Sequence, residues 1–280
     1  MNETPPSRAK SMMKDIFIAL AILLGLSAVF VFTNLDMDFE SLFWSAEVNT
    51  FVKRTEPWYF LYKYSRIVPC VVISGFLAAL VGGFFANNLK KHRKMAVYAI
   101  AVAAIGPGLI TNLMLKEHWG RPRPYNVIEF GGTAEYIPLF VKGPYVPNEK
   151  RMARLSRKTG LFWDLYKKYY PPQGLHNSFP SGHASFAFFM FIFFFILRNT
   201  KYKRRAFWAV MIYGGLVGFG RNVQGGHFPS DILWSAGIVY LTALILYYLM
   251  GMDKSIWYER HLEPASSREN TDEAPGGAVE

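Results

Sequence analysis

The stretch FPSGHASFAFFMFIFFFIL, residues 179–197, places serine, glycine and histidine directly before an apolar run without a charged residue. A second stretch, GRNVQGGHFPSD at 220–231, places arginine, histidine and aspartate between two further apolar runs. A third, KEHWGRPRP at 116–124, follows another apolar run and carries one lysine and two arginines. Each stretch brings reactive polar side chains to the edge of a segment that water would not solvate. We predict that all three lie at a membrane surface.

The composition indicates a membrane protein. Apolar residues make up 51% of the 280 residues and aromatic residues 17%, which is far more than an ordinary soluble domain carries. The formal net charge is +11, but the basic residues cluster in the loops between apolar runs. This pattern favours membrane topology and anionic lipid over nucleic acid as the partner. The single cysteine, Cys70, excludes an intramolecular disulfide.

Six apolar runs predict an all-α fold, a polytopic bundle of six transmembrane helices. A hydrocarbon core of about 30 Å needs about 20 residues of helix. The fourth and fifth runs reach this length only when their motif-bearing ends are included. We therefore expect two helices to start or stop at the residues that carry the chemistry. We predict a retained first span rather than a signal peptide, because no small-residue cleavage site follows it. The runs are residues 16–32, 67–87, 95–115, 184–197, 206–219 and 232–252.

Lysine and arginine in the short loops predict the orientation. The loops 88–94 and 198–205 are rich in both residues and are therefore expected in the cytoplasm, together with both termini. The loops 34–66, 116–183 and 220–231 then lie outside. All three motifs fall on this outer face, where they can share one site.

The long outer loop between the third and fourth spans contains RMARLSRKTGLFWDLYKKYY, residues 151–170. Its aromatic and basic residues separate onto different sides at helical spacing, which predicts an interfacial helix lying on the bilayer. A helix that caps the bundle is the alternative. If the helix lies beside the site, its basic residues are candidate headgroup contacts: Arg154, Arg157 and Lys158. Residues 1–263 then form the membrane domain, and the polar tail 264–280 is expected to be disordered.

Four cations in or near the motifs suit the binding of phosphate. Cleaving a phosphate ester requires cations on its free oxygens, a nucleophile in line with the leaving oxygen, and an acid that protonates that oxygen. Lys116, Arg121, Arg123 and Arg221 lie at the ends of apolar runs, where arginine could contact phosphate through two hydrogen bonds. A single basic residue there is more often a snorkelling anchor. Three stretches that converge with two histidines favour a site.

Ser181, Gly182 and His183 directly precede the fourth run, and Pro180 is a helix start signal. The free backbone N–H groups of a helix start bind anions, and glycine allows close approach of the backbone. His183 could then reach the leaving oxygen. The alternative is that this triplet is only a helix cap.

His227 and Asp231 are four residues apart, a spacing that brings two side chains together on a helix. A carboxylate on one imidazole nitrogen fixes the tautomer and leaves the other nitrogen as a nucleophile. The alternative is a capping aspartate beside a structural histidine. Metal binding is disfavoured, because cations surround these residues and neither HxxxH nor HExxH occurs. We expect neither a metal nor a cofactor.

The three stretches resemble the motifs of the type 2 phosphatidic acid phosphatase superfamily. These are Lys-x6-Arg-Pro from Lys116, Pro-Ser-Gly-His ending at His183, and Ser-Arg-x5-His-x3-Asp ending at Asp231. The chain departs from the third motif at Gly220, which stands where serine is usual.

The resemblance implies a metal-free, six-helix membrane phosphatase that works through a phosphohistidine. His227 would be the nucleophile, Asp231 its orienting partner and His183 the general acid. The phosphate would be held by Lys116, Arg123, Ser181, Gly182 and Arg221. Arg121 lies within the first motif but outside its fixed positions, so it is a candidate headgroup contact.

The segment 116–132 is similar to that of lipid A phosphatases of this family. The resemblance therefore favours lipid A as the substrate and the inner membrane of a bacterium as the location. Undecaprenyl pyrophosphate and phosphatidylglycerophosphate are the alternative substrates. A lipid phosphotransferase, a haloperoxidase and a transporter or lipid-binding module are the alternative functions, and the apolar runs argue against a haloperoxidase because it is typically soluble.

Overall fold

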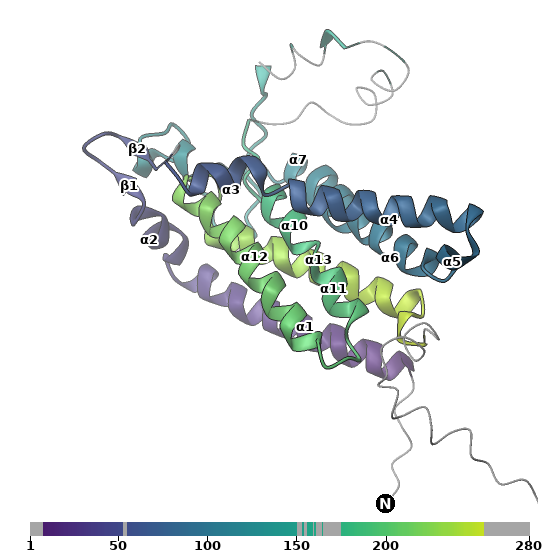
Figure 1. Ribbon diagram of the computed structural model, residues 1–280. Helices are drawn as coiled ribbons and strands as arrows, with labels where there is room; N and C mark the ends of the chain where they lie inside the picture. The colour runs from purple at the N-terminus through teal and green to yellow at the C-terminus, as the bar shows by residue number, and fades with distance from the viewer. Residues whose placement is uncertain are drawn as a thin grey trace, which may run out of the picture.

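Seven helical segments of the computed structural model run side by side as a bundle (Figure 1). The structure describes residues 8–52, 55–149 and 175–254, together with 153, 156–158, 160 and 164. The bundle consists of α1 (Arg8–Phe32), α4 (Ile67–Phe85), α6 (Arg93–Ala103), α10 (Gly182–Phe188), α11 (Phe191–Ile196), α12 (Lys203–Val223) and α13 (Pro229–Leu249). The predicted all-α membrane fold is confirmed in this coarse form.

Four helical stretches of the described chain are long and apolar enough to cross a membrane: Arg8–Phe32, Trp58–Phe85, Arg93–His118 and Pro229–Leu249. The fourth predicted run corresponds to Gly182–Ile196, which is shorter than these four stretches. It is divided at residues 189–190 into α10 and α11. The fifth, α12, has 21 residues and carries the polar pair Arg221 and Asn222 in its last turn. The predicted number of six spans is not confirmed.

The third stretch changes its winding before it reaches the first motif. After α6 the chain continues as a π-helix, η1 (Ala104–Leu115), and then as α7 (Lys116–His118). Pro107 lies inside η1 and has no N–H to donate, which disturbs regular α-helical bonding. The Asn112 side chain donates to the Pro107 carbonyl at 2.6 Å. This wider winding sets the direction from which Lys116 enters the site.

Different helices and strands lie at the two ends of the bundle (Figure 1). The start of α1 and the end of α13 lie at one end, where α5 (Asn87–Lys90) also lies. The other end carries α2 (Leu35–Ser41), the hairpin β1 (Trp44–Ser45) and β2 (Thr50–Phe51), α3 (Trp58–Tyr64) and α7. All three motifs meet at this second end, as the sequence predicts. The membrane face that it occupies stays a prediction.

The main core lies where α6, α10, α11 and α13 meet. Phe189, Ile192, Val239 and Ala243 are fully buried in it. Tyr98 of α6 is also buried and donates its hydroxyl to the carbonyl of Ala243 at 3.1 Å. By contrast α1 is largely exposed along its length, which suits a helix that faces lipid.

A second core lies beneath the motif-bearing end. It joins Phe51 of β2 to Val127, Phe130 and Phe228. Val127 lies between the two 3₁₀ turns η2 (Pro124–Asn126) and η3 (Ile128–Phe130), Phe130 ends η3, and Phe228 directly precedes α13. Phe228 follows His227 in the chain, so this cluster fixes the backbone beside that histidine. The hairpin of β1 and β2 thus packs directly under the site.

The predicted interfacial helix at 151–170 and the predicted disordered tail at 264–280 lie outside the described residues, apart from single positions of the former. Among the candidate headgroup contacts of this segment, Arg154 is not described. Arg157 and Lys158 are described, and both are exposed. The interfacial helix is not confirmed.

Candidate active site

His227 and Asp231 lie together at the start of α13. Their side chains are 1% and 0% exposed, and His227 Nδ1 is 3.6 Å from Asp231 Oδ2. The helix begins at Pro229, so His227 lies just before it and is turned toward its first turn. Asp231 Oδ2 also accepts the backbone N–H of Phe228 at 3.0 Å. The carboxylate therefore caps α13 and faces the imidazole at the same time.

Ser178 holds the same carboxylate from another loop. Its hydroxyl donates to Asp231 Oδ2 at 2.5 Å and lies 3.5 Å from His227 Nδ1. Its backbone N–H donates to the carbonyl of Arg121 at 2.9 Å, which ties this loop to the first motif. The sequence analysis missed Ser178, although it lies only three residues before Ser181.

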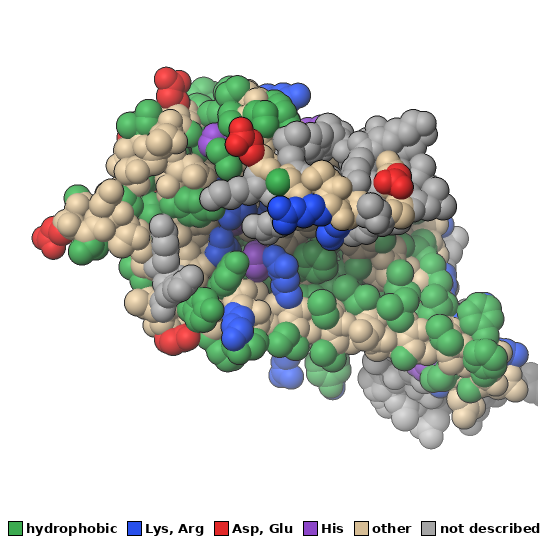
Figure 2. Space-filling view, turned by 90° about the horizontal axis from the view of Figure 1, so that it is seen from above, with side chains coloured by type: hydrophobic (Ala, Val, Ile, Leu, Met, Phe, Trp, Pro, Cys, Tyr) green, Lys and Arg blue, Asp and Glu red, His purple; other side chains and the backbone are tan. Residues whose placement is uncertain are grey.

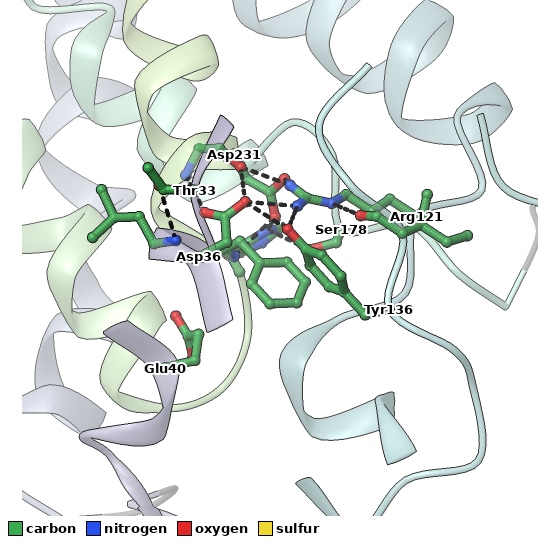
Figure 3. Close-up of polar contacts among 12 residues, drawn as sticks. Thr33, Asp36, Glu40, Arg121, Tyr136, Ser178 and Asp231 are labelled. Carbon is green, nitrogen blue, oxygen red and sulfur yellow. Dashed lines mark hydrogen bonds and ion pairs between the residues drawn. The ribbon is translucent and has the colours of Figure 1, made fainter. Parts of the chain in front are cut away.

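Arg121 is fully buried, and all five of its N–H groups have an acceptor (Figure 3). One terminal nitrogen lies 2.7 Å from Asp231 Oδ1 and the other 2.7 Å from Asp36 Oδ2. The remaining N–H groups donate to the Ile137 carbonyl, the Ser230 hydroxyl and the Tyr136 hydroxyl. Arg121 is therefore not placed as the candidate headgroup contact that the sequence predicts, because its donors are all used inside the protein.

The electrostatics of Arg121 fit this structural position. Burial opposes its charge, but the adjacent carboxylates of Asp231 and Asp36 outweigh burial and raise its pKa above the ordinary value. Its guanidinium also lies 4.5 Å from the centroid of the Phe228 ring. Arg121 is thus permanently charged beside the Asp231 carboxylate.

The cations Lys116, Arg123 and Arg221 surround His227 instead. Burial lowers the pKa of His227 well below its ordinary value, and the charges of these three residues lower it further. The imidazole is therefore neutral at neutral pH. A neutral imidazole with a free ring nitrogen is the form that can act as a nucleophile.

Polar side chains hold the two arginines of this group in place. Arg123 donates to the Asn177 side-chain oxygen at 3.0 Å. Arg221 donates to the Gln224 side chain, and its guanidinium lies 4.7 Å from the centroid of the Tyr62 ring. Within the described part of the chain, neither arginine forms an ion pair with a carboxylate. Their charges are therefore not neutralised by protein carboxylates, unlike that of Arg121.

Two glycines allow the motifs to approach one another. A Cβ on Gly226 would come within 2.1 Å of an Arg221 nitrogen, so only glycine leaves room for that guanidinium. A Cβ on Gly182 would lie 3.2 Å from Lys116 Nζ and 2.7 Å from an oxygen of Asn112. The first and second motifs therefore meet at Gly182.

Ser181 and His183 lie on either side of this glycine. Ser181 is the N-cap of α10, and its side chain accepts the Ala184 N–H at 3.4 Å, so the capping role weighed for this triplet is present. His183 Nδ1 is 3.3 Å from a terminal nitrogen of Arg66, and its ring lies 5.0 Å from that of Tyr62. Since Arg66 can only donate, the contact leaves Nδ1 as the acceptor and the proton on Nε2.

Gly220 lies against α3. A Cβ there would meet Trp58 at 3.5 Å and Leu61 at 3.9 Å, which is ordinary van der Waals contact. The helix α3 thus packs beside the position where the motif usually has serine. Tyr62 and the nearby Arg66, which contact Arg221 and His183, come from the same part of the chain.

Most residues that support the site without holding a fixed motif position are not predicted from the sequence. Outside the motifs these are Asp36, Glu40, Tyr62, Arg66, Asn177 and Ser178, and within the third stretch it is Gln224. Their only sequence signal is position: Asp36 and Arg66 lie beside apolar runs, where a polar residue is ordinarily a solvated anchor.

Basic side chains gather in a hollow on one face of the molecule (Figure 2). Figure 2 shows lysine or arginine side chains around a histidine in a hollow that hydrophobic side chains border. In the described residues, no group of three or more histidine, cysteine, aspartate or glutamate side chains could hold a metal ion. The arrangement can bind a dianion beside a neutral imidazole.

Comparison with known proteins gives a consistent result. Residues 94–255 match the PAP2 superfamily. The chain is 32% identical to a lipid A 4'-phosphatase of Francisella tularensis subsp. novicida (strain U112) over 238 residues, which cover 82% of this chain and 95% of that protein. It is 28% identical to a lipid A 4'-phosphatase of Rhizobium leguminosarum over 162 residues, 56% of each chain. No solved structure matches the chain significantly.

Proposed function

This chain belongs to the PAP2 superfamily and is a membrane lipid phosphatase, and we propose that it removes a phosphate from lipid A through a phosphohistidine on His227. The observation that carries the proposal is the environment of His227. A buried neutral imidazole lies beside an acceptor carboxylate and among three cations, and the two arginines among them form no ion pair with a carboxylate in the described chain. This environment suits attack on a phosphate dianion.

In the first step, His227 Nε2 attacks phosphorus while the bond to the lipid oxygen breaks. Nδ1 carries the remaining proton toward Asp231, so the carboxylate stabilises the imidazolium that forms. His183 acts here as the imidazolium, the form that the bound phosphate dianion favours. Its Nε2 proton passes to the leaving oxygen, the lipid alcohol departs, and His183 is left neutral. Lys116, Arg123 and Arg221 neutralise the equatorial oxygens of the transferring phosphoryl group.

In the second step, His183 accepts a proton from water, and the resulting hydroxide attacks phosphorus as the bond to His227 breaks. Inorganic phosphate leaves and both histidines return to their starting protonation states. The same residue acts as acid and then as base because the second step reverses the proton transfer of the first.

The relatives favour lipid A as the substrate. Two proteins that are similar to this chain carry the name lipid A 4'-phosphatase, and one of them is matched over 95% of its length. Arg157 and Lys158 of the long loop are exposed, and their positive charge suits the phosphate groups of lipid A. Undecaprenyl pyrophosphate and phosphatidylglycerophosphate remain the alternative substrates, and a second lipid in place of water would make the enzyme a phosphotransferase.

Purified protein in detergent provides the test, with phosphate release measured in excess chelator. We expect release from lipid A and slower release from undecaprenyl pyrophosphate, phosphatidylglycerophosphate and phosphatidic acid. His227→Gln should lower kcat at least about 1,000-fold, since the nucleophile is lost. His92→Gln, at the opposite end of the bundle, is the matched control and should keep wild-type turnover. Full activity of folded His227→Gln would contradict the proposed nucleophile.

The role of His183 has a separate test. An aryl phosphate has a good leaving group that needs little protonation, so His183→Gln should still form the phosphoenzyme from it but should hydrolyse it slowly. We expect an acid-labile, base-stable phosphoryl label to accumulate on this variant. If the label neither forms nor persists while the protein is folded, His183 does not have the proposed role.

A further inference from the structure

The short helix α2 carries two buried acidic side chains that the mechanism does not use. Asp36 and Glu40 are one helical turn apart and therefore share one face. Both are 0% exposed, although carboxylates are rarely buried without partners. The family match begins at residue 94, so α2 lies outside it.

Asp36 is joined to the catalytic carboxylate through a single guanidinium. Arg121 lies 2.7 Å from Asp36 Oδ2 on one side and 2.7 Å from Asp231 Oδ1 on the other. Asp36 also accepts the backbone N–H of Ser230 at 3.0 Å and its hydroxyl at 2.6 Å. Figure 3 shows the two carboxylates on either side of the Arg121 group. The Oδ2 atom of Asp231 remains directed toward Ser178 and His227.

The charges explain why a second carboxylate matters. If Arg121 were paired with Asp231 alone, its positive charge would cancel most of the negative charge that His227 faces. With Asp36 present, one cation is shared between two anions, and the group keeps a net negative charge. That charge stabilises the imidazolium that forms when His227 takes up the phosphoryl group. Asp36 thus affects the transition state without touching the substrate.

Glu40 reaches the nucleophile by a different route. Its Oε1 accepts an N–H of the Asn222 side chain at 3.1 Å, and the same amide nitrogen donates to the His227 carbonyl at 2.6 Å. Asn222 follows the motif residue Arg221 in α12. Glu40 therefore orients the amide that holds the backbone of His227.

We propose that α2 is a positioning element for the nucleophile, in which Asp36 acts through Arg121 on Asp231 and Glu40 acts through Asn222 on the His227 backbone. The proposal rests on the proposed function only in taking His227 as the nucleophile. It gives α2, the helix that follows α1, a role in positioning the residues of the site.

The first experiment compares Asp36→Asn with Asp38→Asn. Asp38 is exposed on the same helix and provides a matched control for the loss of one carboxylate. We expect Asp36→Asn to lower kcat by about tenfold to a hundredfold with KM changed less than about twofold, because only the transition state uses this interaction. Asp38→Asn should behave as wild type. Wild-type kcat in Asp36→Asn, beside an inactive His227→Gln, would overturn the proposal while leaving the nucleophile assigned.

A second variant keeps the inference testable if Asp36→Asn does not fold. Arg121→Lys retains the charge but loses the planar fork that reaches both carboxylates. It should lower kcat about tenfold or more at unchanged KM. Unchanged kcat would overturn the claim that Asp36 acts through Arg121 on Asp231. If Asp36→Asn folds, it should lower kcat less in the Arg121→Lys background than in wild type, because the two residues act in one chain. Equal losses in both backgrounds would show that Asp36 acts independently of Arg121.

Glu40 is tested by a conservative and a non-conservative change. Glu40→Gln keeps the oxygen that accepts from Asn222, so kcat should stay within about twofold of wild type. Glu40→Ala removes that acceptor and should lower kcat about tenfold, with the fraction of folded protein measured by size-exclusion chromatography. Equal kcat in both variants would overturn the claim that Glu40 acts through Asn222 on the His227 backbone.

Discussion

At the scale of single residues, the arginines of this site divide into two groups by their partners. Arg121 is neutralised by two carboxylates, whereas Arg123 and Arg221 are held by neutral amides in the described structure. A cation that already has a carboxylate partner gains little by binding phosphate. A cation held by neutral groups is oriented without losing its charge. Burial alone does not separate them, since Arg221 is only 6% exposed.

This difference predicts opposite effects for two substitutions only two positions apart. Arg121→Gln leaves two buried carboxylates without their cation and should destabilise the fold by about 3–5 kcal/mol. Arg123→Gln removes a phosphate contact and should leave the melting temperature within about 2 °C while kcat/KM falls about a hundredfold. Thermal unfolding in detergent and phosphate release measure the two effects. A lower melting temperature for Arg123→Gln than for Arg121→Gln would contradict this division.

Glu40 predicts a pH-dependent stability. Burial raises its pKa well above the ordinary value, and the nearby charges of Asp36 and Asp231 add to this effect. The folded state therefore holds a proton that the unfolded chain releases above about pH 4.3, so the Glu40 contribution to stability is lost as pH rises toward the folded pKa. Glu40→Gln cannot titrate. Its melting temperature should equal that of wild type near pH 4 and exceed it increasingly at higher pH, whereas a constant difference would show that Glu40 does not titrate in this range.

At the scale of elements, α3 supports side chains of the motifs by packing on α12. Gly220 leaves room for Trp58 and Leu61, and the neighbouring Tyr62 and Arg66 reach Arg221 and His183. A helix without motif residues thus positions two residues that belong to the motifs.

Enlarging Gly220 tests this support. Gly220→Leu should displace α3, destabilise the fold by about 1–3 kcal/mol and lower kcat, whereas Gly220→Ala should be tolerated because its Cβ meets only ordinary contacts. Gly215→Leu is the matched control on the same helix, since nothing lies within 4 Å of a Cβ there. Equal losses of kcat in Gly220→Leu and Gly215→Leu would show that α3 has no specific role.

The same elements show how far the sequence predicts the fold and the site. The apolar runs predict the long helices, because composition alone marks a segment that lipid must solvate. Pro180 likewise predicts the start of α10. The sequence does not predict α2, α3 or the hairpin, because they are short and their polar residues match those of a solvated loop. Asp36 therefore escapes detection: its role depends on a contact with Arg121 that is 85 positions away.

At the scale of the whole molecule, charged side chains join different elements at each end of the bundle. At the end opposite the site, Arg8 pairs with Asp253 at 3.0 Å, and Arg198 pairs with Asp15. Lys94 donates to the Gly251 carbonyl at 2.6 Å. These contacts join α1, α6 and the loop before α12 to the end of α13. The basic residues that predict a cytoplasmic location therefore also hold the helices together there.

The orientation of the whole molecule is the last prediction. Positive loops are retained in the cytoplasm, so the end with Asn199 should be internal and the end with Glu47 external. Both residues are exposed and far from the site chemistry, and Cys70 is the only native thiol. In a Cys70→Ser background, a membrane-impermeant thiol reagent should label Glu47→Cys in spheroplasts and should label Asn199→Cys only after permeabilisation. The reverse pattern would place the phosphate-binding end in the cytoplasm, where a substrate of the outer leaflet could not reach His227.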